Sequence, residues 1–406
     1  MHLARRAWCR TYQTVFRIAL PILPYTEPRI LEHAEDVPAV LQKRSIQKVL
    51  IVTDPGIARL GLTASLERAL TAQGIGVTVY AETRANPTVS NVEEAAALYR
   101  ENDCRAIIGF GGGSAMDCAK GVGARIAQPN KPINKMRGLL RVHRLLPLLI
   151  AVPTTAGTGS EVTLAAVITD NETHYKYPIN DFVLIPRFAV HDPEFTRGLP
   201  VSITGQTGMD ALTHAVEAFI GRSTTPYTRK MARQAVQLIH DNLLEAYEHG
   251  DNMRARRNML SAAYKAGVAF TRSYVGYVHA IAHSLGGRYG IPHGLANAII
   301  LPHMLRACGE TAAPKLADLA RMAGIAPATA QDSLAAEAFI DWVDRMNEAL
   351  GIPKYVLGIH RSDIPQMAAH ADAEANPLYP VPLLMDRLEL EHMYEVVAGD
   401  MFEDEN

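Results

Sequence analysis

Short hydrophobic runs alternate with longer helical patterns over the first half of the chain. Runs rich in Val, Ile and Leu, which are typical of buried parallel strands, occur at residues 48–53, 76–80, 104–109, 148–152 and 183–190. Helical patterns lie near residues 57–73 and 91–102. Strands separated by helices of this length favour a largely parallel sheet with right-handed crossovers. We therefore predict an α/β domain with a mostly parallel sheet over residues 30–198.

The pattern changes near residue 199. A predicted linker is crowded with proline and glycine, at Pro193, Gly198, Pro200, Gly205 and Gly208. Beyond it, helical periodicity dominates, near residues 209–220, 227–249, 255–285, 295–307, 312–323 and 333–349. The second half of the chain, residues 199–406, is therefore predicted to be an all-α domain.

Residues 1–29 are predicted to form a basic, amphipathic helical extension. Four arginines precede the first acidic residue, Glu27, and apolar residues recur at helical spacing: Trp8, Tyr12, Val15, Phe16, Ala19 and Leu20. A mitochondrial presequence is also rich in arginine and poor in acids. We favour the alternative that the helix packs this aromatic stripe on the body of the protein or on a second subunit.

Composition narrows the class of protein. A chain of 406 residues with 48% hydrophobic and 20% charged residues is typical of a two-domain globular enzyme. The net charge of −2 gives no general attraction to nucleic acid, and no apolar segment approaches the ~20 residues of a membrane span. The four cysteines are scattered, which favours a reducing compartment. We expect a cytoplasmic protein, or a mitochondrial one if the N-terminal helix is a presequence.

A glycine-rich loop follows the strand at residues 104–109. It contains Gly111, Gly112, Gly113 and Ser114, and a helix with Asp117 in its first turn follows. Consecutive glycines let backbone N–H groups approach a ligand, and a helix N-terminus attracts negative charge, so the loop is suited to a phosphate. Neither a G-x-G-x-x-G nor a Walker motif is present. The alternative is that Ser114 and Asp117 form an ordinary capping box.

A second polar loop follows the strand at residues 148–152. It contributes four hydroxyl groups, from Thr154, Thr155, Thr158 and Ser160. Open α/β sheets bind ligands at the carboxyl ends of their strands, so this loop is a second candidate for the ligand site.

Asp54 directly follows the strand at residues 48–53. A carboxylate here accepts hydrogen bonds from an adenosine ribose and repels the 2′-phosphate of NADP, so it favours NAD. Its alternative role is that of an ordinary Asp-Pro-Gly turn residue.

Two pairs of metal-binding residue types have i, i+4 spacing. Asp210 and His214 form one pair, His279 and His283 the other, and His293 follows. Residues four apart share one face of a helix, so each pair directs both side chains to one region. Three imidazoles and a carboxylate suit zinc or ferrous iron, which acts as a Lewis acid. Spacing alone leaves open whether His283 or His293 is outside the set.

Three runs of residues carry a family resemblance. The runs at 150–163 (IAVPTTAGTGSEVT), 207–218 (TGMDALTHAVEA) and 279–298, which includes HAIAHSLG and PHGLANA, strongly resemble the iron-containing (group III) alcohol dehydrogenases. The likeness covers about residues 30–400. It implies the fold shared with dehydroquinate synthase, with a dinucleotide-binding α/β domain followed by an all-α domain.

The resemblance also implies functional residues. The metal ligands would be Asp210, His214, His279 and His293, and His283 would lie beside the nicotinamide and the metal. The dinucleotide would contact Asp54, Asn86, Gly111, Gly112, Gly113, Ser114, Asp117, Thr154, Thr155, Thr158, Ser160 and Lys176. Because imidazole titrates near neutral pH, His283 is our candidate for a proton relay to solvent.

Together, residues and resemblance predict a metal-dependent alcohol dehydrogenase or aldehyde reductase that transfers a hydride between a primary alcohol and NAD. NAD is favoured over NADP, Fe²⁺ over Zn²⁺, and a homo-oligomer over a monomer. The alternatives are a hydroxyacid–oxoacid transhydrogenase and a metal-dependent hydrolase. Arg272 and Tyr274 depart from the small or amide residues common in the family, and we expect them to reshape the substrate pocket.

Overall fold

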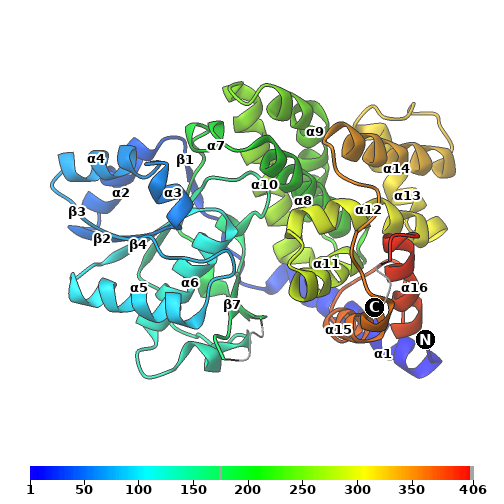
Figure 1. Cartoon of the computed structure of the whole chain (residues 1–406), viewed down its shortest axis with the longest axis horizontal. Coiled ribbons are helices and arrows are strands. Elements are labelled where there is room, and N and C mark those ends of the chain that lie inside the picture. Colours follow the sequence, from blue (N-terminus) through cyan, green and yellow to red (C-terminus); the bar gives the residue numbers. More distant parts are fainter. Residues whose placement is uncertain (173–175, 403–406) are drawn as a thin grey trace. The chain divides into compact units, whose positions relative to one another are not determined.

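The computed structural model describes residues 1–172 and 176–402. The chain forms two compact units (Figure 1). The sheet unit comprises Pro24–Leu199, and the helical unit comprises Met1–Leu23 together with Pro200–Asn406. The predicted fold class is confirmed, because the sheet unit has a six-stranded parallel sheet and the helical unit is built from helices.

The strand order of the main sheet is β1-β9-β6-β4-β2-β3, and every neighbouring pair is parallel. These strands are, in that order, Arg29–Leu31, Phe188–Val190, Leu148–Pro153, Ala106–Gly111, Lys48–Val52 and Gly76–Tyr80. The central strands β6, β4 and β2 are almost wholly buried, which explains their continuous hydrophobic runs. The predicted strand at 183–190 is too long, because residues 182–184 form a 3₁₀ turn and only β9 is extended.

Helices cover both faces of this sheet (Figure 1). On one face, α5 (Val89–Glu101) and α6 (Gly113–Ala127) pack on Leu50, Ile107 and Leu149. On the other, α2 (Val37–Gln42) and α4 (Ala64–Ala72) pack on Val49, Ile108 and Ile150. The helix predicted at 57–73 is two helices, α3 (Pro55–Arg59) and α4, because Gly61 adopts a left-handed conformation between them.

A second, three-stranded sheet lies in the same unit and was not predicted. Its order is β5-β8-β7, with strands Gly138–Leu139, Lys176–Asn180 and Ala165–Thr169. Strand β7 is antiparallel to β8, and its backbone contacts α6.

The helical unit contains nine long helices in its described part beyond residue 200. They are α8 (Val201–Ile220), α9 (Pro226–Glu248), α10 (Met253–Ser273), α11 (Tyr277–Tyr289), α12 (His293–Cys308), α13 (Ala313–Met322), α14 (Asp332–Ala349), α15 (Ile364–Ala375) and α16 (Arg387–Ala398). The sequence pattern did not predict α15 or α16. The predicted helix at 255–285 is also wrong, because the chain breaks at Tyr274, whose φ is 61°, and restarts as α11.

The predicted linker is shorter than expected. Gly205 and Gly208 lie inside α8, not before it. A Cβ atom at Gly208 would clash with a methyl carbon of Leu243 on α9, so glycine here permits close packing of two helices. Glycine signals a helix break in sequence, but here the tertiary contact outweighs its low helix propensity.

The N-terminal helix α1 (Leu3–Ala19) packs on the helical unit through only part of the predicted stripe: Leu20 is buried and Phe16 lies against Tyr274. Trp8 and Val15 are 58% and 61% exposed. Polar contacts also hold the helix: Arg5 forms an ion pair with Asp372, and Arg10 donates to backbone oxygens near Val381. Among the described residues, no helix has both the length and the apolar character needed to cross a bilayer.

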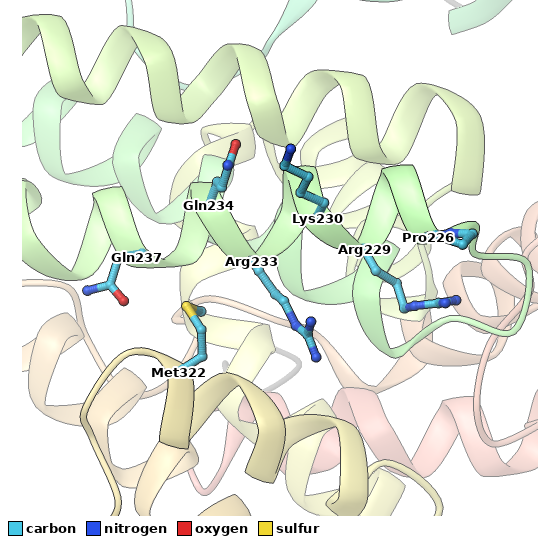
Figure 2. Close-up of a pocket in the computed structure, with 7 residues that line it drawn as sticks. All are labelled: Pro226, Arg229, Lys230, Arg233, Gln234, Gln237 and Met322. Carbon is cyan, nitrogen blue, oxygen red and sulfur yellow. The ribbon is translucent and has the colours of Figure 1, made fainter. Parts of the chain in front are cut away.

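A basic groove of about 420 Å³ lies along α9 (Figure 2). It is lined by Pro226, Arg229, Lys230, Arg233, Gln234, Gln237 and Met322. Arg233 forms an ion pair with Asp318, and Arg229 donates to the Thr224 hydroxyl. None of the predicted site residues contributes to this groove.

Candidate functional site

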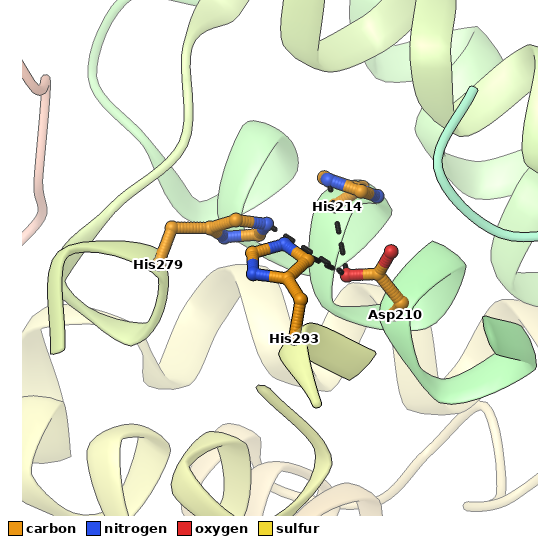
Figure 3. A group of neighbouring side chains, drawn as sticks. All are labelled: Asp210, His214, His279 and His293. Carbon is orange, nitrogen blue, oxygen red and sulfur yellow. Dashed lines mark ion pairs between the residues drawn. The ribbon is translucent and has the colours of Figure 1, made fainter. Parts of the chain in front are cut away.

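Four side chains of the helical unit converge (Figure 3). Asp210 and His214 come from α8, His279 from α11, and His293 from the start of α12. The Asp210 Oδ1 atom lies 4.0 Å from His214 Nε2, 4.0 Å from His279 Nε2 and 3.5 Å from His293 Nε2. The first three side chains are buried, whereas that of His293 is 40% exposed. We call these four residues the metal cluster; it is open to solvent at His293.

The spacing of these atoms fits a divalent cation. A tetrahedral site with metal–ligand bonds near 2.1 Å has ligand–ligand distances of about 3.4 Å, close to the distances observed. The Asn297 amide nitrogen lies 2.7 Å from Asp210 Oδ1, 3.3 Å from His279 Nε2 and 3.1 Å from His293 Nε2. One amide nitrogen thus lies within 3.3 Å of three atoms of the metal cluster, so these atoms surround one point. Three imidazoles and a carboxylate suit Fe²⁺ or Zn²⁺.

Glu217, also on α8, orients His279. Its carboxylate contacts His279 Nδ1 at 2.6 Å and accepts from the backbone N–H groups of Gly276 and Val278, both at 2.9 Å. The hydrogen bond places a proton on Nδ1, so His279 Nε2 has its lone pair directed to the metal cluster. Burial raises the pKa of Glu217 to about 7, although these hydrogen bonds act against the rise. A Cβ atom at Gly276 would stand 2.6 Å from Glu217 Oε1, so a larger residue here would displace this carboxylate.

Aromatic stacking fixes a second ligand candidate. The His214 ring stacks on Phe270 of α10 at a centroid distance of 4.1 Å and on His279 at 4.6 Å.

Burial, together with the neighbouring imidazoles, lowers the pKa of His279 well below its ordinary value. The neutral imidazole is the form that binds a metal.

His283 lies outside the metal cluster, one turn beyond His279 on α11. Its side chain is 44% exposed, and its Nδ1 atom lies 2.7 Å from Glu374 Oε1. Glu374 also accepts a hydrogen bond from the Tyr379 hydroxyl. The His283 ring stacks on His293 at 5.2 Å, so it lies between a member of the metal cluster and solvent.

Arg272 and Tyr274, which depart from the family pattern, each lie against an aromatic side chain. The Arg272 guanidinium lies 5.0 Å from the centre of the Tyr227 ring. The Tyr274 ring meets Phe16 of α1 edge-on at 5.0 Å and lies 6.2 Å from the Tyr379 ring. Tyr274 therefore connects the N-terminal helix to the residues around His283.

In the sheet unit, the glycine-rich loop connects β4 to α6. The N-cap of α6 is Gly112, which has no side chain to accept from the first N–H groups of the helix. The capping-box alternative is wrong: Ser114 donates to the Ala85 carbonyl oxygen, and Asp117 accepts from Ser160 and the Val167 N–H. The N-terminus of α6 thus retains N–H groups that can bind an anion.

The second loop directly follows β6. Its four hydroxyl residues are Thr154, Thr155, Thr158 and Ser160. The Thr155 Oγ1 atom is buried without a hydrogen-bond partner among the described residues, and a Cβ atom at Gly112 would stand 3.7 Å from it. An orphaned hydroxyl beside a side-chain-free backbone fits a ligand with polar oxygens, such as a dinucleotide phosphate or ribose.

The two carboxylate oxygens of Asp54 have different surroundings. Its Oδ1 atom accepts from the N–H groups of Gly56 and Ile57, which caps α3 and confirms the turn interpretation. Its Oδ2 atom lies 3.4 Å from the position of a Cβ atom at Gly111, on the adjacent strand. The second oxygen is therefore beside the glycine-rich loop.

The remaining dinucleotide candidates lie at the edges of the same unit. Asn86 is exposed, in the connection between β3 and α5. Lys176 begins β8 and is half-buried, and this burial lowers its pKa.

Sequence reasoning missed Glu217 and Asn297. Helical spacing contains a signal for both: Glu217 lies three residues beyond His214, and Asn297 four residues beyond His293. Each therefore shares a helix face with a member of the metal cluster.

The chain is similar to known proteins in both sequence and structure. The iron-containing alcohol dehydrogenase family model matches residues 30–193, and its C-terminal counterpart matches residues 204–397. The 1,3-propanediol dehydrogenase of Klebsiella pneumoniae is 39% identical over 81% of this chain and 86% of its own length. The NAD-dependent methanol dehydrogenase of Bacillus methanolicus is 34% identical over 83% and 89%. An alcohol dehydrogenase structure from Oenococcus oeni superposes with a TM-score of 0.88 and 33% identity, covering 92% of this chain and all of the other.

Proposed function

Because the chain belongs to the iron-containing alcohol dehydrogenase family, we propose that it transfers a hydride between a primary alcohol and NAD, with an aldehyde as the oxidised product. The convergence of Asp210, His214, His279 and His293 carries this proposal. Relatives named for methanol and 1,3-propanediol support small primary alcohols as substrates.

The metal cluster would hold one divalent ion. The family favours Fe²⁺, and the same three imidazoles and carboxylate would also suit Zn²⁺. Such an ion supplies a Lewis acid for the oxygen of the substrate. The protein prepares the ligands: Glu217 fixes the tautomer of His279, and Phe270 holds the His214 ring in place.

The dinucleotide would occupy the carboxyl edge of β2, β4 and β6, where NAD supplies the hydride acceptor. The Gly111–Ser114 loop and the N-terminus of α6 suit its pyrophosphate. Thr154, Thr155 and Thr158 would provide hydroxyl contacts, and Asn86 and Lys176 are proposed further contacts.

Purified protein, loaded anaerobically with Fe²⁺, should reduce NAD when small primary alcohols are supplied and oxidise NADH with the matching aldehydes. The absorbance of reduced nicotinamide measures both directions. Metal-loaded protein that binds NAD but turns over no alcohol or aldehyde in a panel would contradict the proposal.

We further propose that the protein is a homo-oligomer in the cytoplasm. Its four cysteines are free thiols, which a reducing compartment favours.

Asp54 should determine the choice of dinucleotide. We expect Asp54→Gly to raise the kcat/KM ratio of NADP over NAD about tenfold or more, or ~1.4 kcal/mol, because the carboxylate no longer repels a 2′-phosphate. Asp54→Asn is the matched variant: it keeps an acceptor for the α3 cap and removes the charge. Steady-state kinetics with both dinucleotides measures the ratio, and an unchanged ratio in both variants would leave Asp54 as a cap residue alone.

His283 should relay the proton released by the alcohol. Its ring stacks on His293 and reaches solvent, and Glu374 holds it in place. We expect His283→Ala to lower kcat by roughly 10–100-fold with unchanged metal content, and added imidazole to restore part of the loss. Unaltered kcat in this variant would exclude the relay.

A further inference from the structure

A fully buried lysine ammonium lies behind the two candidate dinucleotide loops. The Lys120 side chain, on α6, has 0% exposure. Its Nζ atom donates to Ser160 Oγ at 3.0 Å, to Thr163 Oγ1 at 2.8 Å and to the Ala165 carbonyl oxygen at 2.8 Å. An ammonium group has three donors, and all three are used within the protein. Burial of such a charge is strongly unfavourable unless its donors are satisfied, as all three are here.

The charge of Lys120 is balanced through a hydroxyl bridge. The nearest carboxylate oxygen, Asp117 Oδ1, lies 3.9 Å from Nζ, beyond direct hydrogen bonding. The Ser160 hydroxyl accepts from Lys120 and donates to Asp117 Oδ1 at 2.8 Å. The other Asp117 oxygen accepts from the Val167 N–H. A hydroxyl has one proton to donate, so Ser160 has none left for a phosphate oxygen.

We call Asp117, Lys120, Ser160 and Thr163 the loop clamp. Asp117 and Lys120 are three residues apart on α6 and so share one face of the helix that begins at the glycine-rich loop. Ser160 and Thr163 lie at the far end of the second loop. The clamp therefore joins the helix that carries one loop to the end of the other.

The two loops also touch directly, so their separation is sensitive to the clamp. A Cβ atom at Gly113 would stand 3.1 Å from Thr158 Cγ2. The Thr154 N–H donates to the Gly111 carbonyl oxygen at 3.0 Å. A small displacement of the second loop would change the space left between Thr155 and Gly112.

We propose that Lys120 is a positioning residue for the dinucleotide, which, through Ser160 and Asp117, holds the loop at 154–160 at a fixed distance from Gly111–Ser114. This inference rests on the proposed NAD-linked function. It also assigns Ser160 and Asp117 to the clamp instead of to direct side-chain contact with the cofactor. Lys120 touches no reacting atom, so its loss should affect NAD binding and not the chemical step.

The first test compares Lys120→Met with wild type. Methionine keeps the length of the side chain and removes the ammonium. We expect the Kd and KM for NAD to rise about tenfold or more, because the free protein loses its preorganised loops. The kcat at saturating NAD and the metal content should stay within about twofold of wild type. Lys135→Met, the same substitution at an exposed lysine of the sheet unit, is the control and should change neither constant.

A second variant separates two possible roles of Lys120: holding the loop at 154–160 in position, and attracting the negatively charged NAD through its ammonium. Ser160→Ala breaks the bridge but keeps the ammonium, so positioning predicts the same rise in the Kd for NAD, and charge attraction predicts none. The double variant should be no worse than the worse single variant, because both changes disable one clamp. This variant removes a single hydroxyl and also carries the test if Lys120→Met does not fold.

The proposal is overturned if Ser160→Ala binds NAD as tightly as wild type, if the effects of the two substitutions add, or if Lys120→Met lowers kcat and leaves the Kd unchanged. Failure of the proposed function is distinguishable from failure of the clamp. Wild-type protein that binds NAD but oxidises no alcohol would contradict the function and leave the clamp to be tested by NAD binding, whereas wild-type protein that binds no NAD would overturn both.

Discussion

Asp210→Asn and His214→Ala should each remove the bound metal and, with it, alcohol oxidation. Asp210 is the one anionic member of the metal cluster, and its Oδ1 atom lies within 4.0 Å of all three imidazoles. Asparagine keeps the shape of this residue and removes the charge that attracts the cation. Because a Lewis acid contributes several kcal/mol to the transition state, we expect kcat to fall by roughly 10³-fold or more.

Elemental analysis of anaerobically prepared protein should show metal near one ion per chain in wild type and little in either variant. His240→Ala, the same substitution at a helical histidine outside the metal cluster, is the matched control and should retain metal and activity. Either variant with full activity and no metal would refute the assignment of ligands.

Glu217 should have the next largest effect, although it touches no proposed substrate. In Glu217→Gln, an amide nitrogen facing His279 Nδ1 would favour the tautomer with the proton on Nε2, the atom directed to the metal cluster. Partners that orient a metal-binding histidine typically contribute about 10–100-fold to metal affinity, and we expect a loss of that size. Titration of the metal-free protein with Co²⁺ or Zn²⁺ measures it.

Glu217→Ala should also destabilise the protein. It leaves the N–H groups of Gly276, Val278 and His279 without their acceptor in a buried region. Each unsatisfied group costs about 1–3 kcal/mol, so the free energy of unfolding should fall by several kcal/mol, as thermal unfolding would show. Glu348→Gln, at an exposed position on α14, should change neither quantity. Unchanged metal affinity in Glu217→Gln would mean that the tautomer of His279 is set by other contacts.

The residues with the largest expected effects were not equally easy to predict from the sequence. Asp210 and His214 were identified from their i, i+4 spacing, because a helix brings such residues onto one face whatever surrounds it. Glu217 occupies the same helix and shares a face with His214, but that spacing alone does not show which side chain the glutamate contacts. Its function appeared only when α11 placed Gly276 and His279 against it.

The sequence by itself determined the layered core and the helical faces of the site. Strands β2, β4 and β6 were predicted because residues buried on both faces of a parallel sheet must all be hydrophobic. The glycine-rich loop was also recognisable, since three consecutive glycines have few purely structural uses. These features depend on local spacing and composition, which the sequence contains directly.

Only the tertiary structure decided which neighbours these residues meet. It brought His293 into the metal cluster and left His283 beside Glu374, a choice that spacing could not make. It placed Gly205 and Gly208 inside α8, and it turned Trp8 outward from α1. It also linked Lys120 to Ser160, forty positions further along the chain. Each outcome depends on contacts between segments that are distant in sequence, and those contacts form only when the helices and strands pack.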